Sequence, residues 1–285
     1  MVRRIAGVVL ALSAVACGGP VEETLVPELR VLAAIPDVPE AAPGEGLGVQ
    51  VTAIDPDDAG YDALVWLCTP TGPPGAPCLE ATSGTTDGWT ARVDETGRAE
   101  GLTVPAALAG VLSDEVPEVQ TTVWVLTCAP GLCPLIDRAA AATDADSGWD
   151  QLVTDLSDPA AHARELPLEG VALTRRSLVV SMRSEDARNQ HPRFTRTPDA
   201  VQRVAVGGEV TLDFDVEDDE TVDVYGYTTL GGFDASFVTV SDLGYADPTW
   251  IVGEDAESGQ RAELVVIASD GRGGEVLWRG SGEVE

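Results

Sequence analysis

The chain has 285 residues, of which 17 are basic and 48 acidic, giving a formal net charge of −31 at pH 7. A field of this sign repels nucleic acid and anionic membrane surfaces, so the charge argues against both as binding partners. The acidity is typical of the soluble surface of an exposed domain, and its other interpretation is divalent-cation binding. The length allows two domains of ordinary size.

The N-terminus has the pattern of an export signal. Arg3 and Arg4 supply positive charge, and residues 5–16 form an apolar stretch without a charged side chain. This stretch is shorter than the roughly 20 residues that a membrane-spanning helix needs, and it is the right length for a signal-peptide core. We therefore expect residues 1–16 to be removed and the mature protein to be exported.

The signal ends in Ala14-Val15-Ala16-Cys17, which resembles the bacterial lipobox, where small residues precede a cysteine that becomes acylated. The resemblance implies a lipoprotein held in the membrane by a palmitate-bearing Cys17. Gly18 after the cysteine implies delivery to the outer membrane, facing the periplasm or the surface, with residues 17–27 as a flexible tether. The alternative is ordinary signal-peptidase cleavage after Ala16, which would release a soluble protein.

With Cys17 set aside, four cysteines remain: Cys68, Cys78, Cys128 and Cys133. An even number in an oxidising compartment indicates two disulfides, for which three pairings exist. The spacings contain no C-x-x-C pair, which argues against a zinc site. We favour Cys68–Cys78 with Cys128–Cys133, each closing a loop after a strand, and Cys68–Cys128 with Cys78–Cys133 stays open.

The mature chain begins with strands separated by Pro, Gly and Asp turns. In residues 47–54, apolar side chains alternate with small or polar ones, which is the period of a half-buried strand. Residues 63–68 form a second clear strand, and its Trp66 is expected to fill much of a sandwich core. Further strands are predicted at 28–35, 89–93, 99–104, 119–128 and 170–182.

An Ala- and Asp-rich segment interrupts this series at residues 137–165. Its apolar side chains recur at helical spacing, at Trp149, Leu152, Val153 and Leu156. The segment is too small to bury a core of its own. It is therefore predicted to be a helical insertion within a first β-sandwich domain that covers residues 28–184.

A polar segment at 185–198 is the predicted linker to a second sandwich domain at 199–285. Strands are predicted there at 210–216, 222–228, 237–240, 249–252, 262–269 and 275–284. The last two are joined by the turn Asp270-Gly271-Arg272-Gly273-Gly274, where glycines supply the positive φ that a hairpin needs. Strands at about ten-residue intervals favour an all-β fold of two sandwiches.

The two halves repeat one order: a glycine turn, an alternating strand, an acidic turn and a strand with an aromatic residue. The stretches APGE…VTAIDPDD…LVWLC and VGGEVTLDFDVEDDE…ELVVIASDGRGGEVLW resemble immunoglobulin-like domains of the PKD and cadherin-like type found in bacterial surface lipoproteins. The resemblance covers most of the mature chain. It implies two immunoglobulin-like domains that contact other envelope components rather than catalyse a reaction.

No catalytic set is evident. The two histidines, His162 and His191, stand near no nucleophile motif, and the Gly-Ser-Gly around Ser281 lacks the strand–turn–helix context of a nucleophile elbow. Both histidines are therefore interpreted as solvent-exposed, and the protein is predicted not to be an enzyme.

Calcium is the one cofactor with a physical case, because it prefers several oxygen ligands gathered on a loop. Acidic turns supply such oxygens at Asp55, Asp57 and Asp58 and at Asp218 and Asp219, where cadherin-like domains bind the ion. Asp is also common in turns without any metal, because it bonds its own backbone.

The leading hypothesis is a membrane-anchored, non-enzymatic interaction or structural module of the cell envelope, with envelope proteins or polysaccharide as partners. The alternatives are a calcium-stabilised adhesin-like module and a carbohydrate-binding accessory protein. A row of exposed aromatic side chains on one sheet face would favour the last.

Overall fold

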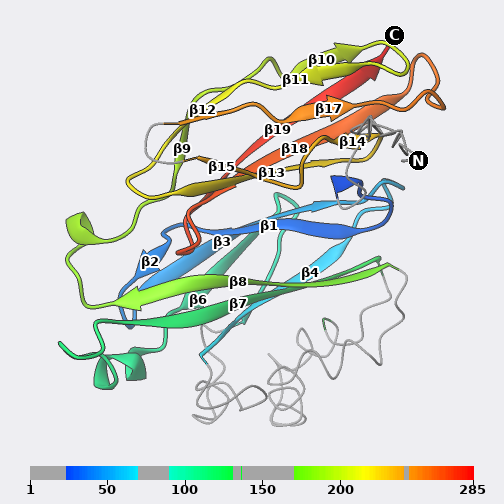
Figure 1. Ribbon diagram of the computed structural model, residues 1–285. Coiled ribbons are helices and arrows are strands. Elements are labelled where there is room, and N and C mark those ends of the chain that lie inside the picture. Colours follow the sequence, from blue (N-terminus) through cyan, green and yellow to red (C-terminus); the bar gives the residue numbers. More distant parts are fainter. Residues whose placement is uncertain (1–23, 70–89, 131–135, 137–169, 241–243) are drawn as a thin grey trace, which may run out of the picture.

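The computed structural model describes residues 24–69, 90–130, 136, 170–240 and 244–285. These residues form two β-sandwiches, one above the other in Figure 1, so the all-β fold of two sandwiches is confirmed. The predicted signal peptide, the predicted helical insertion at 137–165 and three cysteines, Cys17, Cys78 and Cys133, lie outside the described residues. Within them, no helix is long and apolar enough to cross a membrane.

The first sandwich packs a three-stranded sheet against a five-stranded one. The smaller sheet has the order β1-β3-β6, formed by Arg30–Pro36, Gly46–Ile54 and Arg98–Thr103. The larger has the order β2-β8-β7-β4-β5, formed by Glu40–Ala41, Val171–Ser181, Glu118–Cys128, Asp62–Cys68 and Thr90–Arg92. A short 3-10 helix, η3 (Ala106–Gly110), lies between β6 and β7.

The core of this sandwich is aliphatic, and Trp66 is not part of it. Val65 and Leu67 of β4 and Val123 and Val125 of β7 point into the core between the sheets. Because side chains alternate along a strand, Trp66 lies on the opposite face of the sheet. There it stacks on Trp124 of β7, with ring centroids 6.0 Å apart and planes 12° apart. The expectation that Trp66 fills the sandwich core is therefore wrong, although its side chain is fully buried.

The second sandwich has a five-stranded sheet and two three-stranded ones. The large sheet has the order β10-β19-β18-β13-β15, formed by Val201–Val204, Glu275–Val284, Arg261–Ser269, Val222–Thr228 and Val238–Val240. The small ones are β11-β17-β14 (Glu209–Thr211, Thr249–Ile251, Gly232–Phe233) and β16-β12-β9 (Gly244–Ala246, Phe214–Glu217, Arg193–Arg196). Their common core contains Phe214, which lies edge-on to Trp278 at 5.4 Å.

Two predicted segments differ in the structure. The strand expected at 210–216 is divided into β11 and β12, which pair with different partners, β17 and β16. Strands that turn a corner between sheets break in this way, and alternation alone does not reveal it. The expected linker at 185–198 contains the 3-10 turn η4 (Glu185–Ala187) and then β9, which pairs with β12 of the second sandwich. Phe194 of β9 packs on Phe214 at 4.9 Å and so anchors this strand.

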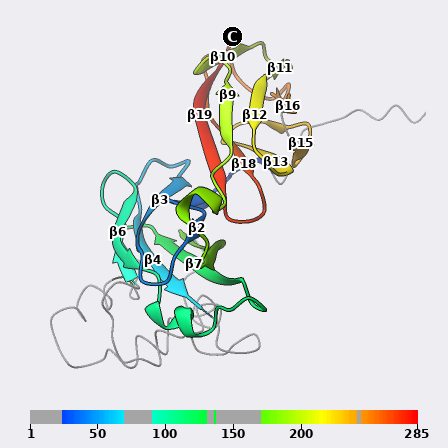
Figure 2. The same ribbon diagram turned by 90° about the vertical axis from the view of Figure 1, so that its left-hand side faces the viewer.

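The β18–β19 hairpin is confirmed. Gly271 and Gly273 in its turn have φ of 73° and 100°, the region that favours glycine. Asp270 accepts hydrogen bonds from the backbone N–H of Arg272 (2.7 Å) and Gly274 (2.9 Å). This turn projects from the second sandwich toward the first, where the two meet (Figure 2).

Candidate functional site

The first described residues belong to the junction between the sandwiches and not to a free tether. Val26 donates a backbone hydrogen bond to the carbonyl of Thr228 (2.8 Å), and the hydroxyl of Thr24 accepts one from the N–H of Phe233 (2.8 Å). Thr24 and Val26 are buried. The tether expected at 17–27 therefore ends before Thr24, because this segment joins the fold before the chain enters β1.

An apolar contact forms the centre of the junction, which we call the domain joint. Leu32, Ala33 and Ile54 of the first sandwich pack with Val26 against Val265 and Ile267 on the outer face of β18. Each of these side chains is buried, and burying a Val, Leu or Ile side chain contributes about 1.5–3 kcal/mol. The apolar part of the joint therefore stabilises the contact between the two domains.

A polar cluster borders this contact, centred on Glu40 of β2. The Glu40 side chain is 0 % exposed and lies 3.4 Å from Arg183. It accepts hydrogen bonds from the hydroxyl of Ser181 (2.5 Å) and the backbone N–H of Asn189 (2.8 Å). Burial by itself would raise the pKa of Glu40, but these bonds and the guanidinium groups of Arg183 and Arg272 lower it below its ordinary value. Glu40 thus holds the linker against the first sandwich as an anion.

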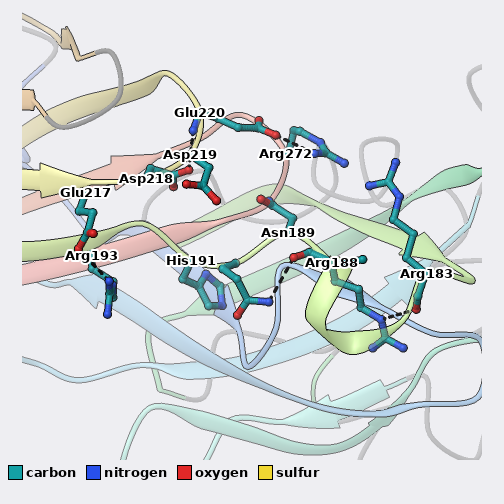
Figure 3. A pocket seen from close by; sticks show the side chains of 12 residues that line it. Arg183, Arg188, Asn189, His191, Arg193, Glu217, Asp218, Asp219, Glu220 and Arg272 are labelled. Carbon is teal, nitrogen blue, oxygen red and sulfur yellow. Dashed lines mark hydrogen bonds and ion pairs between the residues drawn. The ribbon is translucent and has the colours of Figure 1, made fainter.

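Arg272, in the β18–β19 turn, connects the domains. Its guanidinium binds Glu220 of the second domain (2.7 Å) and Glu118 of the first (3.0 Å), as shown in part in Figure 3. Asn189 of the linker also donates to Asp270 in the same turn, at 2.7 Å. The turn is therefore tied both to β7 and to the linker.

His191 bridges the domains with both ring nitrogens. Its Nδ1 accepts a hydrogen bond from the N–H of Glu275 (3.1 Å), so its Nε2 carries the proton and donates to the carbonyl of Pro36 (2.9 Å). Burial lowers the pKa of His191, against the opposing effect of the Pro36 carbonyl. The interpretation of His191 as solvent-exposed is wrong, and His162 lies outside the described residues.

A cavity of about 640 Å³ lies beside the linker. Figure 3 shows the linker on one side of it and the turn between β12 and β13 on the other. Two of the proposed calcium ligands, Asp218 and Asp219, line this cavity. Burial raises the pKa of Asp218, whose Oδ1 accepts the N–H of Glu220 at 2.9 Å. The neighbouring Glu217 pairs with Arg193 at 2.8 Å.

The other acidic turn lies elsewhere. Asp55 follows β3 at the end where Ile54 pairs with Arg30, whereas the linker meets the opposite end of β1 at Pro36. The Asp55 carboxylate accepts hydrogen bonds from the backbone N–H groups of Asp57 (3.2 Å) and Ala59 (2.8 Å), and it therefore stabilises the turn. Asp58 has a φ of 52° there. Among the described residues, no three His, Cys, Asp or Glu side chains converge to hold a metal ion. Calcium at either turn stays a prediction without geometric support.

The cysteines are placed by the register of β4 and β7. Cys68 lies opposite Thr122, and Cys128 lies opposite Asp62 at the other end of the same strand pair. Six residues of strand separate these positions by about 20 Å, whereas a disulfide needs Cα atoms within about 7 Å. The Cys68–Cys128 pairing is therefore wrong. Neither of these two sulfurs is a free thiol.

No protein-family model and no curated protein matches the chain. Among solved structures it is similar to a chimeric titin Z1Z2 (13 % identity, TM-score 0.24, covering 92 % of this chain and 96 % of that one). It is also similar to the D0–D1 domains of intimin (12 %, 0.24, 89 % and 98 %). A third is the N-terminal Ig1–2 module of the Drosophila receptor protein tyrosine phosphatase DLAR (7 %, 0.27, 90 % and 99 %). Likenesses with TM-scores this low carry no argument about this chain.

Proposed function

We propose that this protein is a membrane-anchored lipoprotein that acts as a non-enzymatic interaction or structural module of the cell envelope. The observation that carries the proposal is the domain joint, in which a buried apolar contact is surrounded by hydrogen bonds between the sandwiches. A joint of this kind makes two sandwiches move as one body. Such a rigid body suits a module that presents a binding surface or keeps other envelope components at a fixed distance.

The proposed anchor stands close to this joint in the sequence. Six residues separate Cys17 from Thr24, which is buried against the second sandwich. Even a fully extended chain of this length spans only about 25 Å. An acylated Cys17 would therefore hold the joint, rather than one far end of the molecule, near the membrane. In an exported protein we propose the disulfides Cys68–Cys78 and Cys128–Cys133.

The anchor is tested by labelling cells that express the full chain with an alkyne analogue of palmitate. Wild type should carry the label and sediment with the membranes, because the acyl chain needs the Cys17 sulfur. The Cys17→Ala variant should carry no label, and Cys133→Ser, the matched control, should keep it. An unlabelled wild-type protein, or a labelled C17A variant, would contradict the anchor.

A further inference from the structure

A second cavity, of about 240 Å³, opens at the flank of the domain joint. Both sandwiches contribute to its wall: Leu32 and Arg176 come from the first, and Tyr225, Tyr227, Ile267, Ser269 and Glu275 come from the second. Cavities between domains are a preferred location for small-molecule sites. This one is smaller than the roughly 300–1,000 Å³ of sites for drug-sized ligands, so it suits one ring or the end of a chain.

A buried carboxylate oxygen in this wall lacks a partner. Glu275 lies 3.1 Å from the Nε of Arg176, and its side chain is only 11 % exposed. Its Oε2 is a buried atom without a hydrogen bond, whereas the Arg176 Nε is paired with the other carboxylate oxygen, Oε1. The other nitrogens of Arg176 are occupied by Thr174 and by the carbonyls of Leu32 and Arg175. A buried polar atom left unpaired is costly, so the Glu275 Oε2 favours an occupant that offers a hydrogen-bond donor.

Aromatic side chains line the same face of the large sheet. Tyr225 and Tyr227 alternate on the outer side of β13, both half-buried. Tyr225 contacts Phe237 at 5.8 Å, and Phe237 is 50 % exposed. Burial raises the pKa of Tyr225, so its hydroxyl stays protonated and can donate a hydrogen bond. The face therefore combines flat apolar surfaces with hydroxyl donors.

Charge around the cavity disfavours ions of either sign. Arg176 and Arg30, whose guanidinium lies 5.0 Å from the centre of the Tyr227 ring, oppose a cation. Glu275 and the nearby Asp270 and Asp223 oppose an anion, as does the net charge of the chain. A wholly apolar ligand would leave the Glu275 Oε2 unpaired. A neutral ligand with hydroxyl groups meets all of these conditions.

We propose that this cavity binds one ring of a neutral saccharide, with a hydroxyl group on the Glu275 Oε2 and the ring against Tyr225. The site adds a ligand class to the proposed interaction role and rests on the geometry of the joint. If no saccharide binds, the proposal of an anchored two-domain module is unaffected, because that proposal is tested separately by the acylation of Cys17.

The test is saturation-transfer NMR on the purified mature protein with glucose, galactose, mannose and N-acetylglucosamine at millimolar concentration. Glucosamine and glucuronate serve as the cationic and anionic probes. At least one neutral sugar should receive saturation, and the charged probes should receive less. Tyr225→Ala should weaken binding by about tenfold or more, the cost of one lost polar and stacking contact. Tyr245→Ala is the matched control, because Tyr245 is exposed on β16 in another sheet.

The possible results of this test distinguish saccharide binding at the cavity from its absence. Absence of saturation for every neutral sugar would mean that the cavity holds water only and would overturn the proposal. Stronger binding of a charged probe, or equal binding by Y225A and Y245A, would also overturn it. If Y225A fails to fold by circular dichroism, Tyr225→Phe and Ser269→Ala decide instead. Binding weakened in either of these variants supports the site, and unchanged binding in both overturns it.

Discussion

At the scale of single residues, burial at the joint raises the pKa of Glu275 and lowers the pKa of His191. Burial raises the pKa of Glu275 from 4.5 to about 7, with Asp270 adding to the rise and Arg176 opposing it. The folded protein therefore holds this proton more tightly than the unfolded chain. Its contribution to stability is complete below about pH 4.5 and is lost as the pH rises through about 7. His191, whose pKa is lowered by burial, contributes in the opposite sense and loses its contribution as the pH falls below about 6.5.

Glu275→Gln should make the protein more stable than wild type above about pH 7, by on the order of 1–3 kcal/mol. The reason is that the amide removes the cost of a buried charge while keeping the shape. Near pH 4.5 the difference should disappear, because wild type is then protonated. Urea unfolding at several pH values measures it. Glu283→Gln, on the same strand with a side chain 33 % exposed, is the control and should show no such dependence. An E275Q variant less stable than wild type at pH 8 would refute the argument.

At the scale of elements, β2 shows how a very short strand is held. Its two residues pair in parallel with Val179 and Val180 of β8. Glu40 then ties it to Ser181, Arg183 and the backbone of Asn189. A strand of this length has few ladder bonds of its own, so side-chain bonds determine whether it stays in place. Nothing in the alternation of the sequence distinguishes it from a loop.

Glu40→Gln should lower the free energy of unfolding by about 2–3 kcal/mol, because hydrogen bonds to a charged acceptor are lost and Arg183 keeps only Glu118 as a charged partner. Thermal and urea unfolding of the purified mature protein measure the change. Glu100→Gln is the control, since Glu100 is 62 % exposed on β6 and surface pairs contribute little. An E40Q variant as stable as E100Q would show that the buried carboxylate does not hold the linker.

At the scale of the whole molecule, the two sandwiches share one buried apolar contact. We expect wild type to unfold in a single transition and to scatter X-rays as a body of fixed shape. Ile267→Asp should place an unpaired carboxylate in the joint, which costs several kcal/mol. The domains should then separate, with a larger radius of gyration and two transitions. Val206→Asp is the control, at a side chain already 40 % exposed. Identical scattering from I267D and V206D would contradict a joint that depends on this contact.

The sequence by itself determined the fold class and the longer strands. Alternating side chains located β3, β13 and the β18–β19 hairpin to within a residue or two, because a half-buried sheet requires that period. The same reasoning failed at Trp66. Alternation with a period of two shows which residues share a face of the sheet, but it does not show which of the two faces packs on the core.

Only the tertiary structure decided the joint. The bond from Asn189 to Asp270 and the pair of Arg272 with Glu118 join residues 81 and 154 positions apart. No local pattern marks such partners, because an arginine or carboxylate in a turn looks the same whether it meets solvent or another domain. His191 was expected in solvent for this reason and is instead a bridge. The assignment of Cys68 and Cys128 to opposite strand ends likewise needed the register of β4 on β7, which depends on how the whole sheet assembles.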